Sequence, residues 1–191
     1  MVAYGQHAMA NQWEQRAARV RILLTDCDGV LTDGKVQLLE SGDEQKSFDV
    51  RDGHGIKLCE RAGVRTGVIS GRESSAVERR AKELGMRYLY QGQKRKIDVL
   101  DEILNDAQAT PSECAFIGDD HADIPIMRRV GFAVAVRDAV QDTKDVAHFV
   151  TSNKGGCGAV REICEIILKA RGLWDAVIED YFFERTSSSG R

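Results

Sequence analysis

Short apolar segments alternate along most of this chain with longer segments whose apolar residues recur every three or four positions. The short, β-prone segments predict strands, and the longer periodic ones predict helices. Strands are expected over residues 21–25, 35–39, 45–50, 66–69, 88–90, 114–117, 132–136 and 148–150, and helices over 8–19, 56–62, 74–84, 96–107, 122–129 and 157–171. Because strands and helices alternate, we expect an α/β fold, with a Rossmann-like parallel sheet that carries helices on both faces.

One pair of strands departs from this alternation. The segments 35–39 and 45–50 flank a Ser-Gly-Asp turn at 41–43, which predicts a β-hairpin inserted after the first strand. We therefore divide the chain into an N-terminal segment over 1–19, a domain over 20–171 that carries the hairpin at 34–50, and a C-terminal tail over 172–191. The last residues, 186–191, are rich in Ser and Gly and are expected to be disordered.

Composition narrows the class of protein. A net charge of −3 over 191 residues gives no reason to expect a nucleic-acid partner. No apolar run approaches the roughly 18 residues that a membrane helix needs, and the N-terminus lacks the apolar core of a signal peptide. The 5 cysteines are odd in number and show no C-x-x-C spacing, which disfavours a disulfide framework or a zinc site and suits a reducing cytoplasm.

The first strand ends in two carboxylates one residue apart. Asp26 and Asp28 follow the apolar run and precede Gly29. Residues two apart on a strand project to the same side, and open α/β sheets bind ligands at the carboxyl ends of their strands. These acids are therefore candidates for a site, although a solvated turn would carry the same residue types.

Three more polar groups follow later strands of the predicted sheet. Ser70 ends the strand over 66–69, Lys96 begins the helix after the strand over 88–90, and Asp119, Asp120 and Asp123 follow the strand over 114–117. Each has a simpler explanation: the serine as a helix cap, the lysine as a solvated helix start, and the acids as an N-cap with helix-dipole partners. The order of all four motifs resembles that of the haloacid dehalogenase superfamily of phosphotransferases, over roughly residues 20–150.

This resemblance implies a role for each motif. Asp26 is the nucleophile that forms an aspartyl-phosphate, and Asp28 is the general acid and base. Ser70 and the backbone amides around Asp28 and Gly71 hold phosphate oxygens. Lys96 neutralises both the phosphate and the nucleophile, and its spacing fits the family better than that of Lys94. A carboxylate that attacks a phosphate dianion meets repulsion on the order of 4 kcal/mol per like-charge pair. The resemblance therefore also implies Mg²⁺, which prefers oxygen ligands, on the Asp26 and Asp119 carboxylates and the Asp28 carbonyl, with Asp123 and Asp120 in support.

The spacing between the motifs leaves no room for a cap domain over the site. Further segments, at 48–56, 69–72, 90–93 and 154–162, resemble the capless 3-deoxy-D-manno-octulosonate 8-phosphate phosphatases. These are magnesium-dependent homotetramers that act on an eight-carbon sugar acid for lipopolysaccharide. The resemblance implies that the hairpin builds the tetramer, and that a neighbouring site lies near Asp49, Val50, Arg51, Asp52 and Gly53. Arg51, Lys57 and Arg72 are candidate contacts to a sugar carboxylate. The chain departs from the family at Asp49 and Cys157.

Other functions stay open at this stage. A phosphatase of a nine-carbon sugar acid would use the same fold. A receiver domain of signalling also carries an acidic pair, a phosphorylated Asp, a Ser or Thr and a Lys, but in another order along the chain. A catalytically idle oligomerisation module would not need Asp28. Cys27 alternates away from both acids and is expected to be packed, and His121 has no assigned role because magnesium does not favour imidazole.

Overall fold

The computed structural model describes residues 12–40 and 44–187. The first part of the helix expected over 8–19, the turn at 41–43 and residues 188–191 of the expected tail lie outside the described residues. Helix α1 (Gln12–Ala17) is the described part of the first expected helix.

A six-stranded parallel sheet forms the centre of the molecule, as predicted. Its strands run in the order β5-β4-β1-β6-β7-β8, and every neighbouring pair is parallel. Their bounds are β1 Ile22–Thr25, β4 Arg65–Ile69, β5 Tyr88–Tyr90, β6 Cys114–Gly118, β7 Phe132–Ala135 and β8 Phe149–Val150. All residues of β1, β6 and β7 are buried, because a parallel sheet is covered on both faces.

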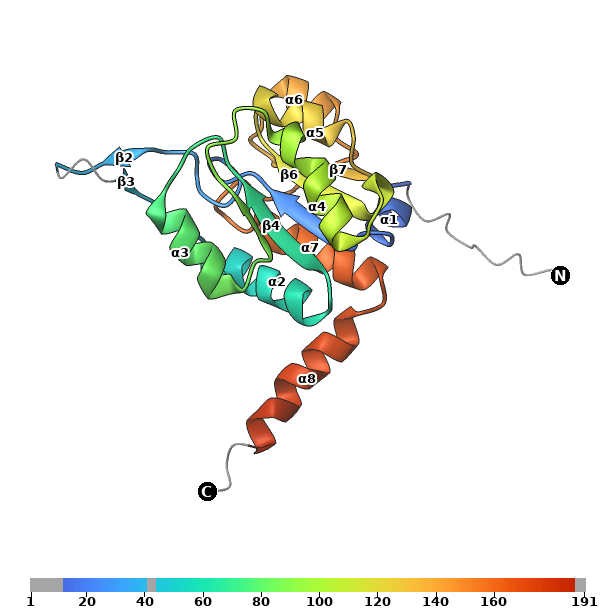
Figure 1. Cartoon of the computed structure of the whole chain (residues 1–191). Coiled ribbons are helices and arrows are strands. Elements are labelled where there is room, and N and C mark those ends of the chain that lie inside the picture. The colour runs from blue at the N-terminus through green and yellow to red at the C-terminus, as the bar shows by residue number, and fades with distance from the viewer. Residues whose placement is uncertain (1–11, 41–43, 188–191) are drawn as a thin grey trace.

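Helices cover both faces of this sheet, which confirms the expected layers. Figure 1 shows α4 (Leu100–Ala107) and α5 (Ile124–Met127) over one face, and α2 (Val50–Arg61) and α7 (Ala159–Ala170) over the other. Helix α3 (Ser75–Leu84) packs beside α2, and the short α6 (Gln141–Asp145), which the pattern did not predict, packs against β7. Two 3₁₀ turns, Lys96–Val99 and His121–Asp123, lead into α4 and α5.

The hairpin is confirmed, but its second strand is shorter than predicted. β2 (Gln37–Leu38) pairs antiparallel with β3 (Glu44–Gln45). The expectation of a strand up to residue 50 is wrong, and so is a helix start at 56, because α2 begins at Val50. Asp49 accepts hydrogen bonds from the Arg51 and Asp52 amides, which caps this earlier start. The helix continues through Gly55 because α7 packs against it: a Cβ there would lie 3.1 Å from the Cys164 Cβ.

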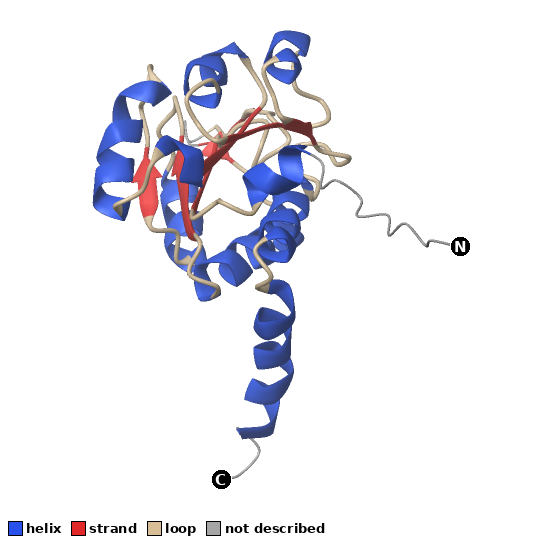
Figure 2. Ribbon diagram, turned by 90° about the vertical axis from the view of Figure 1, so that its right-hand side faces the viewer, coloured by secondary structure: helices blue, strands red, loops and turns tan. Residues whose placement is uncertain are grey.

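Most of the segment described as a tail is helical. α8 (Trp174–Ser187) follows α7 after a short turn and extends away from the body of the molecule (Figures 1 and 2). The Trp174 ring at its start receives the Lys169 ammonium at 4.7 Å from the ring centroid, which anchors this end to α7. In the part of the chain that the structure describes, no helix is both long and apolar enough to cross a membrane.

Candidate active site

The carboxyl ends of three neighbouring strands meet at one edge of the sheet. β4 and β6 pair on either side of β1, so the residues that follow these strands converge where the strand order changes direction. They line a cavity of about 360 Å³ together with residues from the loop before α4: Asp26, Asp28, Ser70, Gly71, Arg72, Gln93, Lys94, Lys96, Asp119, Asp120 and Ala122. The sequence motifs therefore come together in space.

Lys96 links the first and last of these motifs. Its Nζ lies 2.6 Å from Asp26 Oδ1 and 2.7 Å from Asp123 Oδ1, and its side chain is buried. Burial alone would lower the pKa of Lys96, but the two carboxylates raise it overall, so the ammonium form is favoured. Lys94 is exposed at the cavity rim. The structure thus places Lys96, not Lys94, against the candidate nucleophile.

Asp123 is held in place by hydrogen bonds to both of its carboxylate oxygens. It is fully buried, and its Oδ2 accepts hydrogen bonds from the Asp119 amide at 2.9 Å and the Asp120 amide at 3.3 Å. Because its Oδ1 binds Lys96, Asp123 couples the loop after β6 to the lysine. It holds Asp119 in position through the backbone.

Three carboxylates form a pocket suited to a divalent cation. Asp26, Asp119 and Asp123 each offer an oxygen within 4.8 Å of the others. Burial first, and then Asp26 and Asp123, raise the pKa of Asp119 to about 8, while burial and Asp123 raise the pKa of Asp26 to about 6. Asp119 Oδ1 is buried and takes part in no hydrogen bond with the described residues. A bound cation would offset the repulsion between these carboxylates and would give the unpaired Asp119 oxygen a partner. Mg²⁺ prefers oxygen ligands, so these residues fit it.

Two glycines allow close packing of the backbone at this site, Gly29 against a carboxylate and Gly155 against the loop after β1. Gly29 adopts φ +94°, and a Cβ there would lie 2.0 Å from Asp119 Oδ2. A Cβ at Gly155 would lie only 1.7 Å from the Gly29 carbonyl oxygen, and the Gly156 amide donates to the Val30 carbonyl at 2.8 Å. The glycine turn before α7 therefore supports the loop after β1.

Ser70 faces the cavity instead of capping a helix. It is buried, and its Oγ accepts a hydrogen bond from the Arg72 amide at 3.2 Å. The N-cap of the following helix α3 is Ser74, four positions later. The hydroxyl hydrogen of Ser70 and the nearby Gly71 backbone, which also lines the cavity, are thus placed where an oxyanion could be held.

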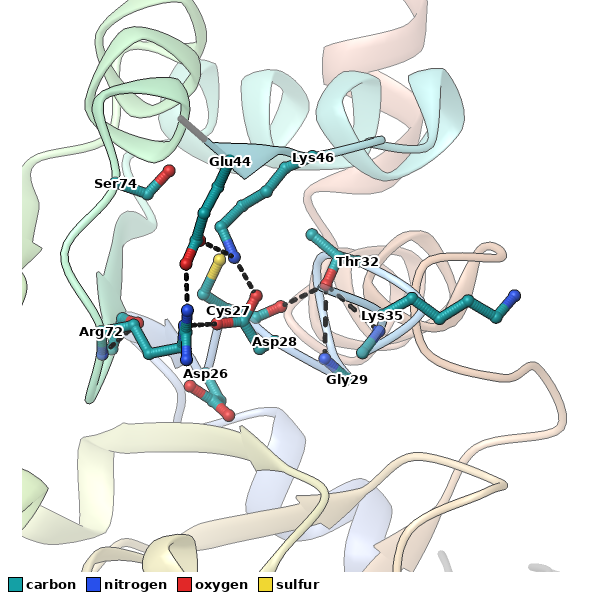
Figure 3. Close-up of polar contacts among 12 residues, drawn as sticks. Asp26, Cys27, Asp28, Gly29, Thr32, Lys35, Glu44, Lys46, Arg72 and Ser74 are labelled. Carbon is teal, nitrogen blue, oxygen red and sulfur yellow. Dashed lines mark hydrogen bonds and ion pairs between the residues drawn. The ribbon is translucent and has the colours of Figure 1, made fainter. Parts of the chain in front are cut away.

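Figure 3 shows the Asp28 carboxylate directed toward Arg72 and toward Lys46 of the hairpin. Its Oδ1 forms a close ion pair with Lys46, and Arg72 Nε lies 3.9 Å from its Oδ2. Arg72 also forms a close ion pair with Glu44. Sequence reasoning missed both hairpin residues, since no motif marks them. The one available signal is that Glu44 and Lys46 are two positions apart, a spacing that places side chains on the same side of an extended backbone.

The remaining candidate substrate residues lie around the start of α2. Asp49 caps that helix and forms an ion pair of 2.9 Å with Arg51. Val50 and Lys57 are exposed, and Val50 lines a separate cavity of about 310 Å³ with residues of α3. Gly53 packs against Arg80, whose Nη2 would lie 2.2 Å from an added Cβ. These residues are thus separate from the cavity that holds Asp26.

Asp52, also expected to bind substrate, serves the chain's own packing. Its buried carboxylate accepts from the Arg161 amide at 2.7 Å and from the Gly158 amide at 3.2 Å. Burial raises the pKa of this carboxyl to about 6 in spite of these bonds. The two oxygens satisfy amides at the beginning of α7, which fixes the glycine turn relative to α2.

Two residues left without a role are accounted for by their surroundings. Cys27 is buried as expected, and burial with the two neighbouring aspartates raises the pKa of its thiol to about 12, so it is not a nucleophile at neutral pH. His121 is exposed and its Nε2 lies 2.8 Å from Asp142 Oδ2. It points to the surface side of the loop that carries Asp119.

Known proteins resemble this chain in sequence and in fold. The profile of haloacid dehalogenase-like hydrolases matches residues 88–163. A 3-deoxy-D-manno-octulosonate 8-phosphate phosphatase of Yersinia pestis is 45% identical over 157 residues, which are 82% of this chain and 84% of that protein. A crystal structure of such a phosphatase from Yersinia pestis has a TM-score of 0.85 at 43% identity, covering 86% of this chain and 89% of that one. A structure from Moraxella catarrhalis, in complex with magnesium ion, phosphate ion and a KDO molecule, has a TM-score of 0.87 at 38% identity over 90% and 99%.

Proposed function

Because this chain belongs to the 3-deoxy-D-manno-octulosonate 8-phosphate phosphatase family of haloacid dehalogenase-like hydrolases, we propose that it releases phosphate from that sugar-acid phosphate through an aspartyl-phosphate on Asp26. One observation carries this mechanism: the buried Asp26 carboxylate is held by Lys96, 2.6 Å away, at the base of a cavity that also contains Ser70 and Asp119. A nucleophile, a cation and oxyanion donors thus share one small space.

In the first step, one Asp26 oxygen attacks phosphorus and the bond from phosphorus to the sugar oxygen breaks. Lys96 orients the nucleophile and offsets the negative charge that accumulates. The Ser70 hydroxyl and the Gly71 amide bind phosphate oxygens. Asp28 donates the proton that the leaving sugar oxygen requires.

In the second step, the same Asp28 reverses its role. Its carboxylate removes a proton from a water molecule, and the resulting oxygen attacks the phosphorus of the aspartyl-phosphate. The bond to Asp26 breaks, which restores the carboxylate and releases inorganic phosphate. Asp28 regains its proton, so the site returns to its starting state.

The carboxylates of Asp26 and Asp119 and the carbonyl of Asp28 would hold Mg²⁺, with Asp123 and Asp120 as supporting acids. When bound, the ion supplies positive charge for the phosphate oxygens and for the carboxylates that face each other here. The raised pKa of Asp119 and its unpaired Oδ1 support this assignment.

A substrate panel tests the proposed function and its metal together. We expect the highest kcat/KM for phosphate release with the eight-carbon sugar-acid phosphate, lower values with a nine-carbon sugar-acid phosphate and with mannose 6-phosphate, and no turnover with a chelator. Magnesium should restore activity to the wild type but only weakly to Asp119→Ala, because that variant lacks a proposed ligand. Activity that persists without magnesium, together with tightly bound zinc, would indicate another kind of hydrolase, and no phosphate release at all would indicate an idle module.

The hairpin supports a homotetramer in which hairpins pack together and each site is completed by a neighbour. Val36 and Leu39 are each 46% exposed and Leu38 is 74% exposed, on a two-stranded element with open edges. Such apolar edges favour association, and closed symmetric assembly would bury them. We also propose a cytoplasmic location, since all five cysteines are free thiols.

Replacing Val36 and Leu38 with Ser should lower both the mass of the assembly and its activity on the sugar-acid phosphate. Sedimentation velocity at assay concentration measures the first, and phosphate release the second. Activity on phenyl phosphate, a smaller substrate, should fall less. The matched control is Val140→Ser, a change at an exposed valine outside the hairpin. A wild-type protein that sediments as a monomer and is nevertheless fully active and selective for the sugar-acid phosphate would contradict the tetramer.

A further inference from the structure

Four charged side chains form a closed ring beside the cavity. Asp28 pairs with Lys46, Lys46 Nζ lies 3.6 Å from Glu44 Oε2, Glu44 Oε1 pairs with Arg72, and Arg72 Nε lies 3.9 Å from Asp28 Oδ2 (Figure 3). Acids and bases alternate, so each cation faces two carboxylates. The ring joins the loop after β1, the loop after β4 and the hairpin.

Lys46 is buried to an unusual degree for a lysine on a projecting hairpin. Its side chain is only 2% exposed, whereas Leu38 on the partner strand is 74% exposed. The hairpin thus turns a lysine inward and an apolar residue outward, the reverse of what hydropathy favours. A buried ammonium needs anionic partners, and it finds them in Asp28 and Glu44.

The ring contains the group that protonates the leaving sugar oxygen in the proposed mechanism. Asp28 is the proposed proton donor to the sugar oxygen, and Arg72 lines the same cavity as Asp26 and Ser70. A sugar whose phosphate lies beside Asp26 must extend past Asp28. Lys46 and Arg72 are therefore in position to meet groups on the sugar.

Glu44 is the member of the ring that is easiest to displace. β2 and β3 pair over only two residues each, so little structure holds this segment in place. Its Oε2 is buried and takes part in no hydrogen bond with the described residues, although Lys46 lies within ion-pair distance. Glu44 thus places an incompletely bonded carboxylate between two cations.

We infer that Lys46 and Arg72 form a subsite for the carboxylate of the sugar acid, and that Glu44 occupies this subsite until a substrate carboxylate replaces it. This inference rests on the proposed function and adds two specificity-determining residues, Lys46 and Glu44. The exchange replaces one carboxylate by another between the same cations, so it leaves no buried charge unpaired.

Lys46→Met and Glu44→Gln should change selectivity in opposite directions. Because Lys46→Met removes one charge-assisted hydrogen bond to the substrate carboxylate, it should lower kcat/KM for the sugar-acid phosphate about tenfold more than for mannose 6-phosphate. Glu44→Gln removes the competing charge and should lower KM for the sugar-acid phosphate several-fold relative to mannose 6-phosphate. The inhibition constant of the free eight-carbon sugar acid should rise in the first variant and fall in the second.

The inhibition constant separates binding from chemistry, because Lys46 also touches Asp28. Matched controls are Lys82→Met and Glu78→Gln, the same charge changes at exposed positions of α3 outside the hairpin, and both should keep the wild-type ratio of kcat/KM values. If Lys46→Met does not fold, the KM values and the inhibition constant of Glu44→Gln are sufficient to test the subsite. Equal effects on both substrates with an unchanged inhibition constant overturn the subsite. A wild type that does not prefer the sugar acid overturns the proposed function and the subsite with it.

Discussion

Asp26→Asn is expected to abolish turnover of every phosphate ester. An amide oxygen is a poor nucleophile and cannot form the acyl phosphate, so the reaction loses its covalent route. The variant also removes the negative charge that Lys96 faces at 2.6 Å. Asn has the same shape as Asp, and the backbone N–H of residue 26, which donates to the Ile117 carbonyl at 2.9 Å, is not changed by the substitution. The fold should therefore persist. Phosphate release measures the loss, and circular dichroism checks the fold.

Asp33→Asn is the matched control for this variant. Asp33 belongs to the same loop, but it is exposed and pairs only with Lys35 among the described residues, so near-normal turnover is expected. Acid quenching of the wild type with radiolabelled substrate should trap phosphate on protein, and Asp26→Asn should trap none. Near-normal turnover by Asp26→Asn, or an equal label on both proteins, would contradict the mechanism.

The position of Asp26, Ser70, Lys96 and Asp119 in one site could be predicted from sequence, because carboxyl ends of parallel strands meet at one edge of a sheet. Strand pairing supplies this proximity without any detail of side-chain packing. The choice between Lys96 and Lys94 rested on spacing. The structure adds the physical difference, which is that only Lys96 is buried between two carboxylates.

The start of α2 could not be predicted in the same way. Gly53 and Gly55 lower helix propensity by about 1 kcal/mol each relative to Ala, so the pattern favours a later start. In the structure both are close to other elements, Gly53 to Arg80 and Gly55 to α7, and this tertiary packing offsets the low propensity. Asp52 likewise finds its partners more than 100 residues away, at Gly158 and Arg161.

The hairpin shows the same limit at the site itself. Its existence follows from a local turn signal, but the direction in which it folds back depends on contacts with Asp28 and Arg72, which belong to other loops. An alternating pattern places Glu44 and Lys46 on one face without saying what that face meets. The residues proposed to act on the phosphate could therefore be predicted from sequence, whereas the two proposed to determine specificity for the rest of the substrate, Glu44 and Lys46, could not.

Asp28→Asn is expected to slow turnover of the sugar-acid phosphate by roughly 10² to 10⁴-fold, the usual contribution of general acid–base catalysis. An amide can neither protonate the sugar oxygen nor remove a proton from water. With 4-nitrophenyl phosphate, whose leaving group needs no proton, the first step should remain fast while hydrolysis of the aspartyl-phosphate stays slow. Rapid-quench measurement should then show a burst of one nitrophenolate per site, followed by slow turnover.

That burst distinguishes a lost proton carrier from a distorted site. Asp28 faces Lys46 and Arg72 and not the carboxylate cluster of Asp26, Asp119 and Asp123, so its replacement by Asn should leave the nucleophile and its lysine in place. Asp119→Ala, which alters the proposed metal site, is the contrasting variant and should lose the burst together with turnover. An Asp28→Asn protein without a burst, or one with wild-type steady-state rates on both substrates, would show that Asp28 does not carry the proton in both steps.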